Sequence, residues 1–157
     1  MIIGIAAVDR QGAIGKGGKL PWHYSVDMKF FRETTTGHAV VMGRKTWLTI
    51  GKPLKNRLNI VLSRDSTIEP QESLLVLTDF EAVISLNESL TTDLFVIGGA
   101  QIYALFGPWI EKWIITEVPL TVKGADAFMP ENYREGFTET DSKSIGEGLK
   151  VKFYERR

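Results

Sequence analysis

The segment VVMGRKTWLTIGKPLKNRLNIVLSR, residues 40–64, decides the fold class. It contains two short apolar runs, AVVMG (39–43, counting the preceding alanine) and LNIVLS (58–63). Both runs are continuous rather than alternating, which is typical of strands covered on both faces. Between them, residues 44–50 favour a helix that starts directly after a glycine. A strand, a helix and a second strand in succession predict an α/β fold with right-handed crossovers.

The same alternation continues along the rest of the chain. Further helices are predicted over 25–35, over 79–86 with Asp79 as N-cap, and over 99–106. Further strands are predicted at IIGIAAV (2–8), LLVL (74–77), LFVIGG (94–99), WIITEV (113–118), FTET (137–140) and VKFYE (151–155). The last third lacks strong helical signals, so its strands are expected to be antiparallel, with GEG (146–148) as a hairpin turn.

These elements predict one domain over residues 1–157, with no separate second domain. The expected α/β fold has a central mixed, mostly parallel twisted sheet of about eight strands and about four flanking helices. The C-terminal strands are expected to close one edge of this sheet in antiparallel fashion.

Composition and charge narrow the function classes. Nineteen basic residues balance 19 acidic residues, so no long-range field favours nucleic acid or an anionic membrane. With no cysteine, a disulfide framework and a thiolate metal site are impossible, and a reducing cytoplasm is the expected location. The first apolar run, residues 2–8, has no basic region before it and is too short to span a bilayer, which indicates a buried strand rather than a signal peptide. His23 and His38 lack spaced partners, so no metal site is predicted.

Asp27 lies on the apolar side of the helix predicted over 25–35. At about 100° per residue, its arc of the helix also holds Tyr24, Met28, Phe30, Phe31 and Thr34. A buried carboxylate is costly unless a cation or hydrogen-bond donor meets it, and no basic residue shares this arc. The expected partner is therefore a ligand with paired N–H donors. In the alternative, Ser25 caps the helix and Asp27 only favours the helix dipole.

Two glycine-containing segments suit a close approach of backbone to a ligand. DRQGAIGKGGKLPW (9–22) predicts a mobile loop beside a ligand, or a plain surface loop. FVIGGAQIYALF (95–106) enters a glycine pair and then a helix, where free N–H groups can hold a pyrophosphate. Its glycines are adjacent, so it is a weak dinucleotide fingerprint, and a simple tight turn is also compatible with the pair.

Basic residues near two strand ends suggest an anion site. Arg44 and Lys45 stand at a predicted helix N-terminus, where cations oppose the dipole unless an anion docks there. In LSRDS (62–66), Ser63 and Arg64 end the next strand. Together the four side chains suit a lone phosphate; alternatively, Arg44 and Lys45 are simply solvated charges.

Taken together, these segments resemble the dihydrofolate reductase family over nearly the whole chain. IGIAAVDRQGAIGKGGKLPW resembles the family's first strand and mobile active-site loop, and the acid in LPWHYSVDMKFF resembles its catalytic carboxylate. The segment at 40–64 resembles its most diagnostic block, VIGGAQIY its cofactor turn, and IITEV with GADAFMP its later strand and acidic loop.

The resemblance implies NADPH-dependent reduction of 7,8-dihydrofolate to tetrahydrofolate, which supports one-carbon metabolism. It further implies a monomer that antifolates inhibit and that binds neither nucleic acid nor membrane. Hydride is expected to pass from nicotinamide C4 to pterin C6. A proton is expected at N5 through water near the mobile loop, because Asp27 is too far from N5 on the family's geometry.

The resemblance also implies the residues of each site. The catalytic residues are Asp27, Trp22 and Thr116. The substrate-binding residues are Ile5, Asp27, Met28, Phe31, Arg32, Ile50, Lys52, Leu54, Arg57, Ile97, Tyr103 and Thr116, with Arg57 on the α-carboxylate of the glutamate tail. The cofactor-binding residues are Ala7, Ile14, Gly15, Leu20, Gly43, Arg44, Lys45, Thr46, Leu62, Ser63, Arg64, Gly98, Gly99, Ala100, Gln101 and Ile102. Of these, Arg44, Lys45, Ser63 and Arg64 are expected on the 2′-phosphate, and the Gly98–Gly99 bond is expected to be cis.

Two alternative functions stay open at this point. One is a pyrimidine reductase of riboflavin biosynthesis, which the Pro21-Trp22 to Asp27 segment and Arg57 disfavour. The other is a non-catalytic pterin-binding module, which would not need both Asp27 and the loop on the nicotinamide side. The chain departs from common members of the family at Leu20, Met28 and Ala100, and these changes are expected to alter loop dynamics and fit more than chemistry.

Overall fold

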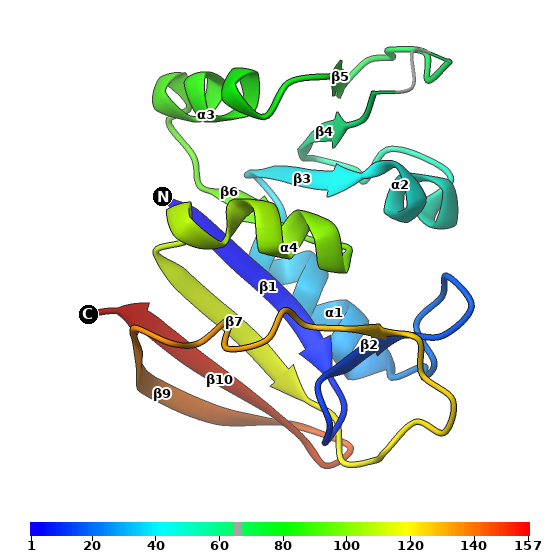
Figure 1. The fold of residues 1–157 in the computed structure, drawn as a ribbon, viewed down its shortest axis with the longest axis vertical. Helices are drawn as coiled ribbons and strands as arrows, with labels where there is room; N and C mark the ends of the chain where they lie inside the picture. Colours follow the sequence, from blue (N-terminus) through cyan, green and yellow to red (C-terminus); the bar gives the residue numbers. More distant parts are fainter. Residues whose placement is uncertain (65–66) are drawn as a thin grey trace.

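An eight-stranded sheet runs through the molecule, in a computed structural model that describes residues 1–64 and 67–157 (Figure 1). The strand order is β5–β4–β3–β6–β1–β7–β10–β9. These strands are β1 (Ile2–Val8), β3 (Ala39–Gly43), β4 (Leu58–Leu62), β5 (Leu74–Leu77), β6 (Leu94–Val96), β7 (Lys112–Glu117), β9 (Phe137–Gly146) and β10 (Leu149–Arg156). Neighbouring strands from β5 to β7 are parallel, and the two remaining pairings, β7–β10 and β10–β9, are antiparallel. The predicted fold class is confirmed. Residues 65 and 66, which end the LSRDS segment, lie outside the described residues.

The helices also lie where the sequence predicts them. They are α1 (Ser25–Thr35), α2 (Arg44–Ile50), α3 (Phe80–Ser89) and α4 (Ala100–Phe106), followed by the short 3-10 helix η1 (Gly107–Trp109). Asp79 is the N-cap of α3, and its carboxylate accepts the Glu81 N–H at 3.1 Å, as predicted. The N-cap of α1 is Tyr24, so the alternative in which Ser25 caps this helix is wrong. Ser25 is already helical because the chain is still extended at Tyr24.

The sheet separates two apolar clusters. Along β1, alternate side chains point to opposite faces, so Ile3 and Ile5 belong to one cluster and Ile2 and Val8 to the other. Helices α1 and α2 cover the first face with Phe30, Phe31, Trp47 and Ile50. Helices α3 and α4 cover the second face with Val83, Tyr103 and Phe106. Figure 1 shows α4 in front of the sheet and α1 behind it.

The antiparallel edge ends in the predicted hairpin turn. Gly146 pairs with Leu149, and the two residues between them, Glu147 and Gly148, have φ of 55° and 80°. Two positive φ angles in succession are the mark of a type I′ turn, which matches the twist of a hairpin. A second, two-stranded sheet of β2 (Ala13–Gly15) and β8 (Ala127–Phe128) was not predicted. No helix in the described part is long and apolar enough to cross a membrane.

Candidate active site

The sheet changes direction of winding at β6, which lies between β3 and β1 although it follows both in the chain. In open α/β sheets, ligands bind at the carboxyl ends of strands near such a point. Here β3 ends at Gly43 and β6 leads into Ile97, Gly98 and Gly99. The Gly43 N–H donates to the Gly98 carbonyl at 2.9 Å, so the two turns lie side by side.

Glycine is required where these two turns meet. A Cβ at Gly43 would lie 2.9 Å from the Ile102 side chain, and Gly98 has a φ of 113°. The Gly98–Gly99 bond is cis, as the resemblance implies. Helices α2 and α4 both start here without a side-chain cap, so their first N–H groups face the turn. This bare backbone suits a pyrophosphate.

The predicted phosphate residues line up along the same edge. Strand β3 pairs with β4 so that Gly43 is opposite Leu62, which brings the next residues, Arg44 and Ser63, to the same level. Arg44, Lys45 and Arg64 are exposed, whereas Ser63 is buried. A cluster of cations beside a hydroxyl can hold a phosphate monoester.

Asp27 is half-buried in the first turn of α1. Burial raises the pKa of this carboxyl, and a hydrogen bond from the Thr116 side chain opposes that rise only in part. Thr116 is 2% exposed and pairs with Ala7 across β1 and β7. Within the described ranges, no lysine or arginine forms an ion pair with Asp27.

Trp22 carries a second polar group, its indole N–H, that lacks a hydrogen-bond partner in the described part of the chain. The Nε1 atom is buried. A buried N–H without an acceptor is uncommon and favours a ligand or ordered water at that point.

The predicted walls of the substrate pocket come together on the α1–α2 face of the sheet. Ile5 is buried in that cluster, and Phe31, Ile50, Leu54 and Ile97 pack against it. Met28 departs from the predicted arc, since its side chain is 55% exposed. Met28 lies at the solvent-facing edge of the arc, beside the exposed Lys29.

Arg57 is a buried guanidinium that two hydrogen bonds hold in place. It is 9% exposed, its Nε donates to the Lys55 carbonyl at 2.8 Å, and its Nη1 donates to the Thr35 hydroxyl at 3.0 Å. Burial and the nearby Arg32 charge lower the pKa of Arg57, and neither effect is relieved by a carboxylate in the described ranges. Arg32 and Lys52, the other predicted residues at this mouth, are exposed.

The loop over residues 9–22 is tied down on both sides. Asp126 accepts the Gly17 N–H at 3.0 Å, and the Asp126 N–H donates to the Gly15 carbonyl at 3.2 Å. From the other side, the Thr49 hydroxyl on α2 donates to the Gly18 carbonyl at 2.9 Å. Of the predicted nicotinamide-side residues, Ala7 is half-buried in β1, Ile14 and Gly15 lie in β2, and Leu20 is 57% exposed.

Tyr103 does not join the predicted substrate walls. Its ring belongs to the cluster on the α3–α4 face, and only its hydroxyl reaches through to donate to the Ile5 carbonyl at 2.7 Å. Full burial raises the pKa of this hydroxyl far above its usual value, so it stays a donor. Tyr103 thus fixes the Ile5 backbone from behind.

A model of the dihydrofolate reductase family matches residues 1–155. The chain belongs to the dihydrofolate reductase family. The Staphylococcus haemolyticus dihydrofolate reductase is 34% identical over 146 residues, which cover 93% of this chain and 84% of that protein. The Mycobacterium tuberculosis (strain ATCC 25618 / H37Rv) dihydrofolate reductase is 40% identical over 125 residues, 76% of this chain and 73% of that one.

A solved structure agrees with these matches. The Enterococcus faecalis dihydrofolate reductase, complexed with NADP(H) and RAB-propyl, has a TM-score of 0.91 and 30% identity. The match covers 100% of this chain and 96% of that one. The predicted family and enzyme class, an NADPH-dependent dihydrofolate reductase, are confirmed by this membership.

The sequence analysis does not include two residues that hold the 9–22 loop beside the candidate site, Asp126 and Thr49. Asp126 could have been found, because it is an acid in a glycine-containing loop that the resemblance already marked. Thr49 carried no signal, since a threonine on a short helix is ordinary and its contact depends on where the 9–22 loop lies.

Proposed function

We propose that Asp27 holds the pterin ring of 7,8-dihydrofolate during its reduction to tetrahydrofolate by NADPH. The observation that carries this proposal is a half-buried carboxylate with no ion pair to any cation in the described ranges. A pterin offers a 2-amino group and a ring nitrogen, which can pair with both carboxylate oxygens. The pair satisfies the buried charge and favours the protonated form of the ring.

The chain's contribution to the chemistry is orientation and electrostatics. The nicotinamide, when bound, supplies the hydride that C6 of the pterin receives. Asp27 and Thr116 fix the ring, and Ile5, Phe31, Ile50, Leu54 and Ile97 exclude water from its faces. The Trp22 N–H suits a water molecule that delivers the proton to N5. Addition of hydride at C6 and proton at N5 balances the reduction of the 5,6 double bond.

Arg57 would clamp the α-carboxylate of the glutamate tail, with Arg32 and Lys52 beside it. A planar guanidinium can meet a carboxylate with two parallel N–H donors. Two bonds to Thr35 and Lys55 already fix the orientation of Arg57. Antifolate inhibitors would compete with the substrate for the same pocket.

The residues of the glycine turns fit NADPH. Gly43, Gly98 and Gly99 leave the backbone bare where a pyrophosphate needs room, and Thr46 lies 3.9 Å from the position of a Cβ on Gly99. Arg44, Lys45, Ser63 and Arg64 would hold the 2′-phosphate, which gives a preference for NADPH over NADH. We also propose a cytoplasmic location, which the cysteine-free sequence suits, and a monomer, the form that the resemblance implies.

The test is the loss of NADPH absorbance with dihydrofolate, repeated with the pyrimidine precursor of riboflavin. Turnover is expected with dihydrofolate and not with the riboflavin precursor.

For Asp27→Asn, turnover at pH 7 should fall by roughly 10²- to 10⁴-fold and recover in part as pH falls, because solution protonation of the substrate replaces the missing charge. Full activity of Asp27→Asn at pH 7 would remove Asp27 from the mechanism, and turnover with the riboflavin precursor would favour the alternative reductase.

A further inference from the structure

The four methionines of the chain differ in exposure. The chain has no cysteine, so methionine supplies all of its sulfur. Met42 in β3 is fully buried and Met129 is 8% exposed, whereas Met1 and Met28 are 53% and 55% exposed. Peroxide converts a thioether to a sulfoxide, and access to the sulfur sets how readily this happens. Met1 and Met28 are therefore the two positions that a peroxide reaches first.

Met1 lies at the opposite end of the sheet from the candidate site. Its carbonyl accepts the Leu94 N–H at 2.9 Å, where β6 begins, and its amino group pairs with the Asp93 carboxylate at 3.3 Å. The glycine turns of the candidate site follow the other end of β6. A chemical change at Met1 therefore leaves the site untouched.

Met28 lies on the side of α1 that leads to Arg57. Positions i, i+3 and i+7 of a helix form one stripe, so Met28, Phe31 and Thr35 share a side of α1. The Thr35 hydroxyl accepts the Arg57 guanidinium at 3.0 Å, and Phe31 packs in the α1–α2 cluster. Seven helical residues rise about 10 Å, so Met28 lies that far from Thr35 and next to Asp27. A molecule that joins Asp27 to Arg57 runs along this stripe, with Met28 at its solvent-facing edge.

Oxidation changes the chemistry of this edge. The sulfoxide turns a flexible apolar side chain into a polar one. The thioether of Met28 suits the apolar middle of dihydrofolate, whereas a sulfoxide oxygen buried there without a donor is costly. Phe31 offers no donor to that oxygen. Arg32, four residues along the helix, can donate to it, but this bond draws the guanidinium away from the glutamate tail. Both outcomes weaken binding of the substrate.

We propose that Met28 is an oxidation site through which hydrogen peroxide lowers the affinity of the chain for dihydrofolate, and that reduction of the sulfoxide restores it. This proposal rests on the proposed function, which places the substrate between Asp27 and Arg57. In the forward step the thioether gains one oxygen and the peroxide is reduced to water. In the reverse step two thiols become a disulfide and the oxygen leaves as water, a reaction that methionine sulfoxide reductases catalyse.

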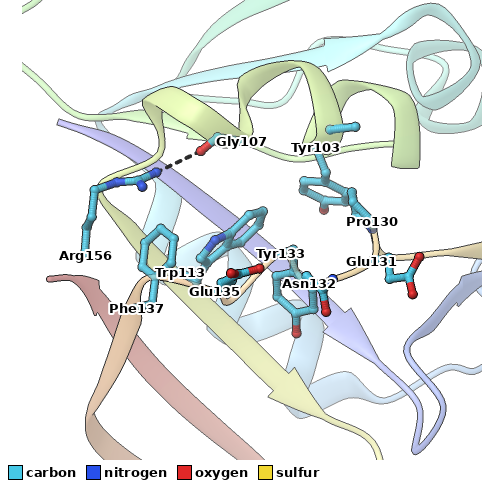
Figure 2. Close-up of a pocket in the computed structure, with 11 residues that line it drawn as sticks. Tyr103, Gly107, Trp113, Pro130, Glu131, Asn132, Tyr133, Glu135, Phe137 and Arg156 are labelled. Atoms are coloured by element: carbon cyan, nitrogen blue, oxygen red, sulfur yellow. Dashed lines mark hydrogen bonds between the residues drawn. The ribbon is translucent and has the colours of Figure 1, made fainter.

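Met129 is the internal reference for the first experiment. It belongs to the cluster on the α3–α4 face and directly precedes Pro130, which lines a cavity of about 270 Å³ beside α4 (Figure 2). Peptide mass spectrometry follows each methionine during treatment with dilute hydrogen peroxide. Met28 and Met1 are expected to be oxidised well ahead of Met129. Oxidation of Met28 no faster than that of Met129 would overturn the proposal.

The same time course tests whether Met28 borders the substrate. Folate with NADP⁺ should slow the oxidation of Met28 and leave that of Met1 unchanged. Equal rates at Met28 with and without folate would overturn the proposal. Turnover of the untreated protein is measured first, so that a missing protection is judged on a working enzyme. An untreated protein without dihydrofolate turnover would instead overturn the proposed function.

Kinetics after removal of the peroxide by catalase test the consequence. The KM for dihydrofolate should rise roughly threefold to tenfold through the lost apolar contact, with little change in kcat or in the KM for NADPH. Met28→Leu is the matched variant, because it has a similar volume and no sulfur, and each protein is compared with itself before and after treatment. The KM of Met28→Leu should not respond, although Met1 is oxidised in both proteins. No rise in the parent, or the same rise in Met28→Leu, would overturn the proposal.

Reversal separates this oxidation from general damage. Methionine sulfoxide reductases for both sulfoxide epimers, with dithiothreitol, should return the KM of the oxidised parent to its starting value. Mass spectrometry confirms that the Met28 sulfoxide has been reduced. A KM that stays raised after this reduction would trace the loss to another change, and the proposal fails.

Discussion

Asp27 has an environment that opposes its charge, and this has a consequence for stability. Burial raises its pKa in the folded state above the ordinary value of 3.8, although Thr116 opposes the rise. The folded chain therefore binds more protons than the unfolded chain between 3.8 and that raised pKa. Stability from this group falls as pH rises through that window and stays reduced above it.

Asp27→Asn removes this cost. We expect the variant to have a higher free energy of unfolding than the parent at pH 7, with the gain shrinking as pH falls towards 3.8. Urea unfolding at pH 7 and pH 5 measures the effect. Asp141→Asn, a change at an exposed acid, is the control and should stay within about 0.5 kcal/mol of the parent. Lower stability of Asp27→Asn at pH 7 would mean that the carboxylate is satisfied within the protein.

Arg57 separates binding of the glutamate tail from binding of the pterin. Arg57→Lys keeps the charge but loses the planar fork, and so should raise the KM for dihydrofolate by about 10- to 100-fold with a small change in kcat. Dihydropteroate, which lacks the glutamate, is the matched substrate. Its KM should be the same for both proteins, and an equal rise for the two substrates would place Arg57 away from the tail.

At the scale of elements, Asp9 joins two loops that border the candidate site. Its Oδ1 accepts the N–H groups of Gln11 and Ala13, and its Oδ2 accepts that of Val122, all at 2.8 Å. Burial by itself would raise the pKa of Asp9, but these backbone donors outweigh it and lower the pKa. The carboxylate thus holds the start of the 9–22 loop against the segment after β7.

Asp9→Asn replaces one acceptor oxygen with an amide donor that faces an N–H. We expect a loss of about 1–3 kcal/mol in the free energy of unfolding at pH 7, measured in urea. The parent's stability from Asp9 is complete above 3.8 and is lost as pH falls through the lower folded pKa. The deficit of the variant should accordingly narrow only in acid. A variant as stable as the parent at pH 7 would contradict this role.

Most elements could be predicted because their signals are local. The apolar runs at 2–8, 39–43 and 74–77 match β1, β3 and β5 residue for residue, and Asp79 marks the start of α3. The strands β2 and β8 could not be predicted, since three and two residues carry no periodicity and their pairing depends on two loops distant in sequence. The helix arc around Asp27 was correct in direction but too wide at Met28.

At the scale of the whole molecule, the sequence predicts one face of the sheet better than the other. On the α1–α2 face, the helix pattern identifies Asp27 and the resemblance identifies Thr116 and Arg57, and the structure brings Asp27 and Thr116 together. The α3–α4 face holds only the end of one motif, since VIGGAQIY continues into α4, and no motif marks the contact between β1 and β7 on this face. The Trp113 ring fits over Gly4 because β1 and β7 are neighbours in the sheet and the two residues are register partners. The order of strands in a sheet cannot be read from the sequence of either strand alone.

The contact between Gly4 and the Trp113 ring gives a test of how tightly β1 and β7 are packed. A Cβ at Gly4 would be 2.2 Å from a fully buried indole that cannot move aside. Gly4→Ala should therefore cost about 1–3 kcal/mol of unfolding free energy through overpacking. Gly107→Ala is the matched control, because nothing lies within 4 Å of its added Cβ and its φ is negative.

The decisive comparison is a double-mutant cycle. In a Trp113→Leu background the ring that causes the clash is gone, so Gly4→Ala should cost much less than in the parent. An equal cost in both backgrounds would mean that the loss comes from the β1 backbone itself and not from contact between the two strands' side chains.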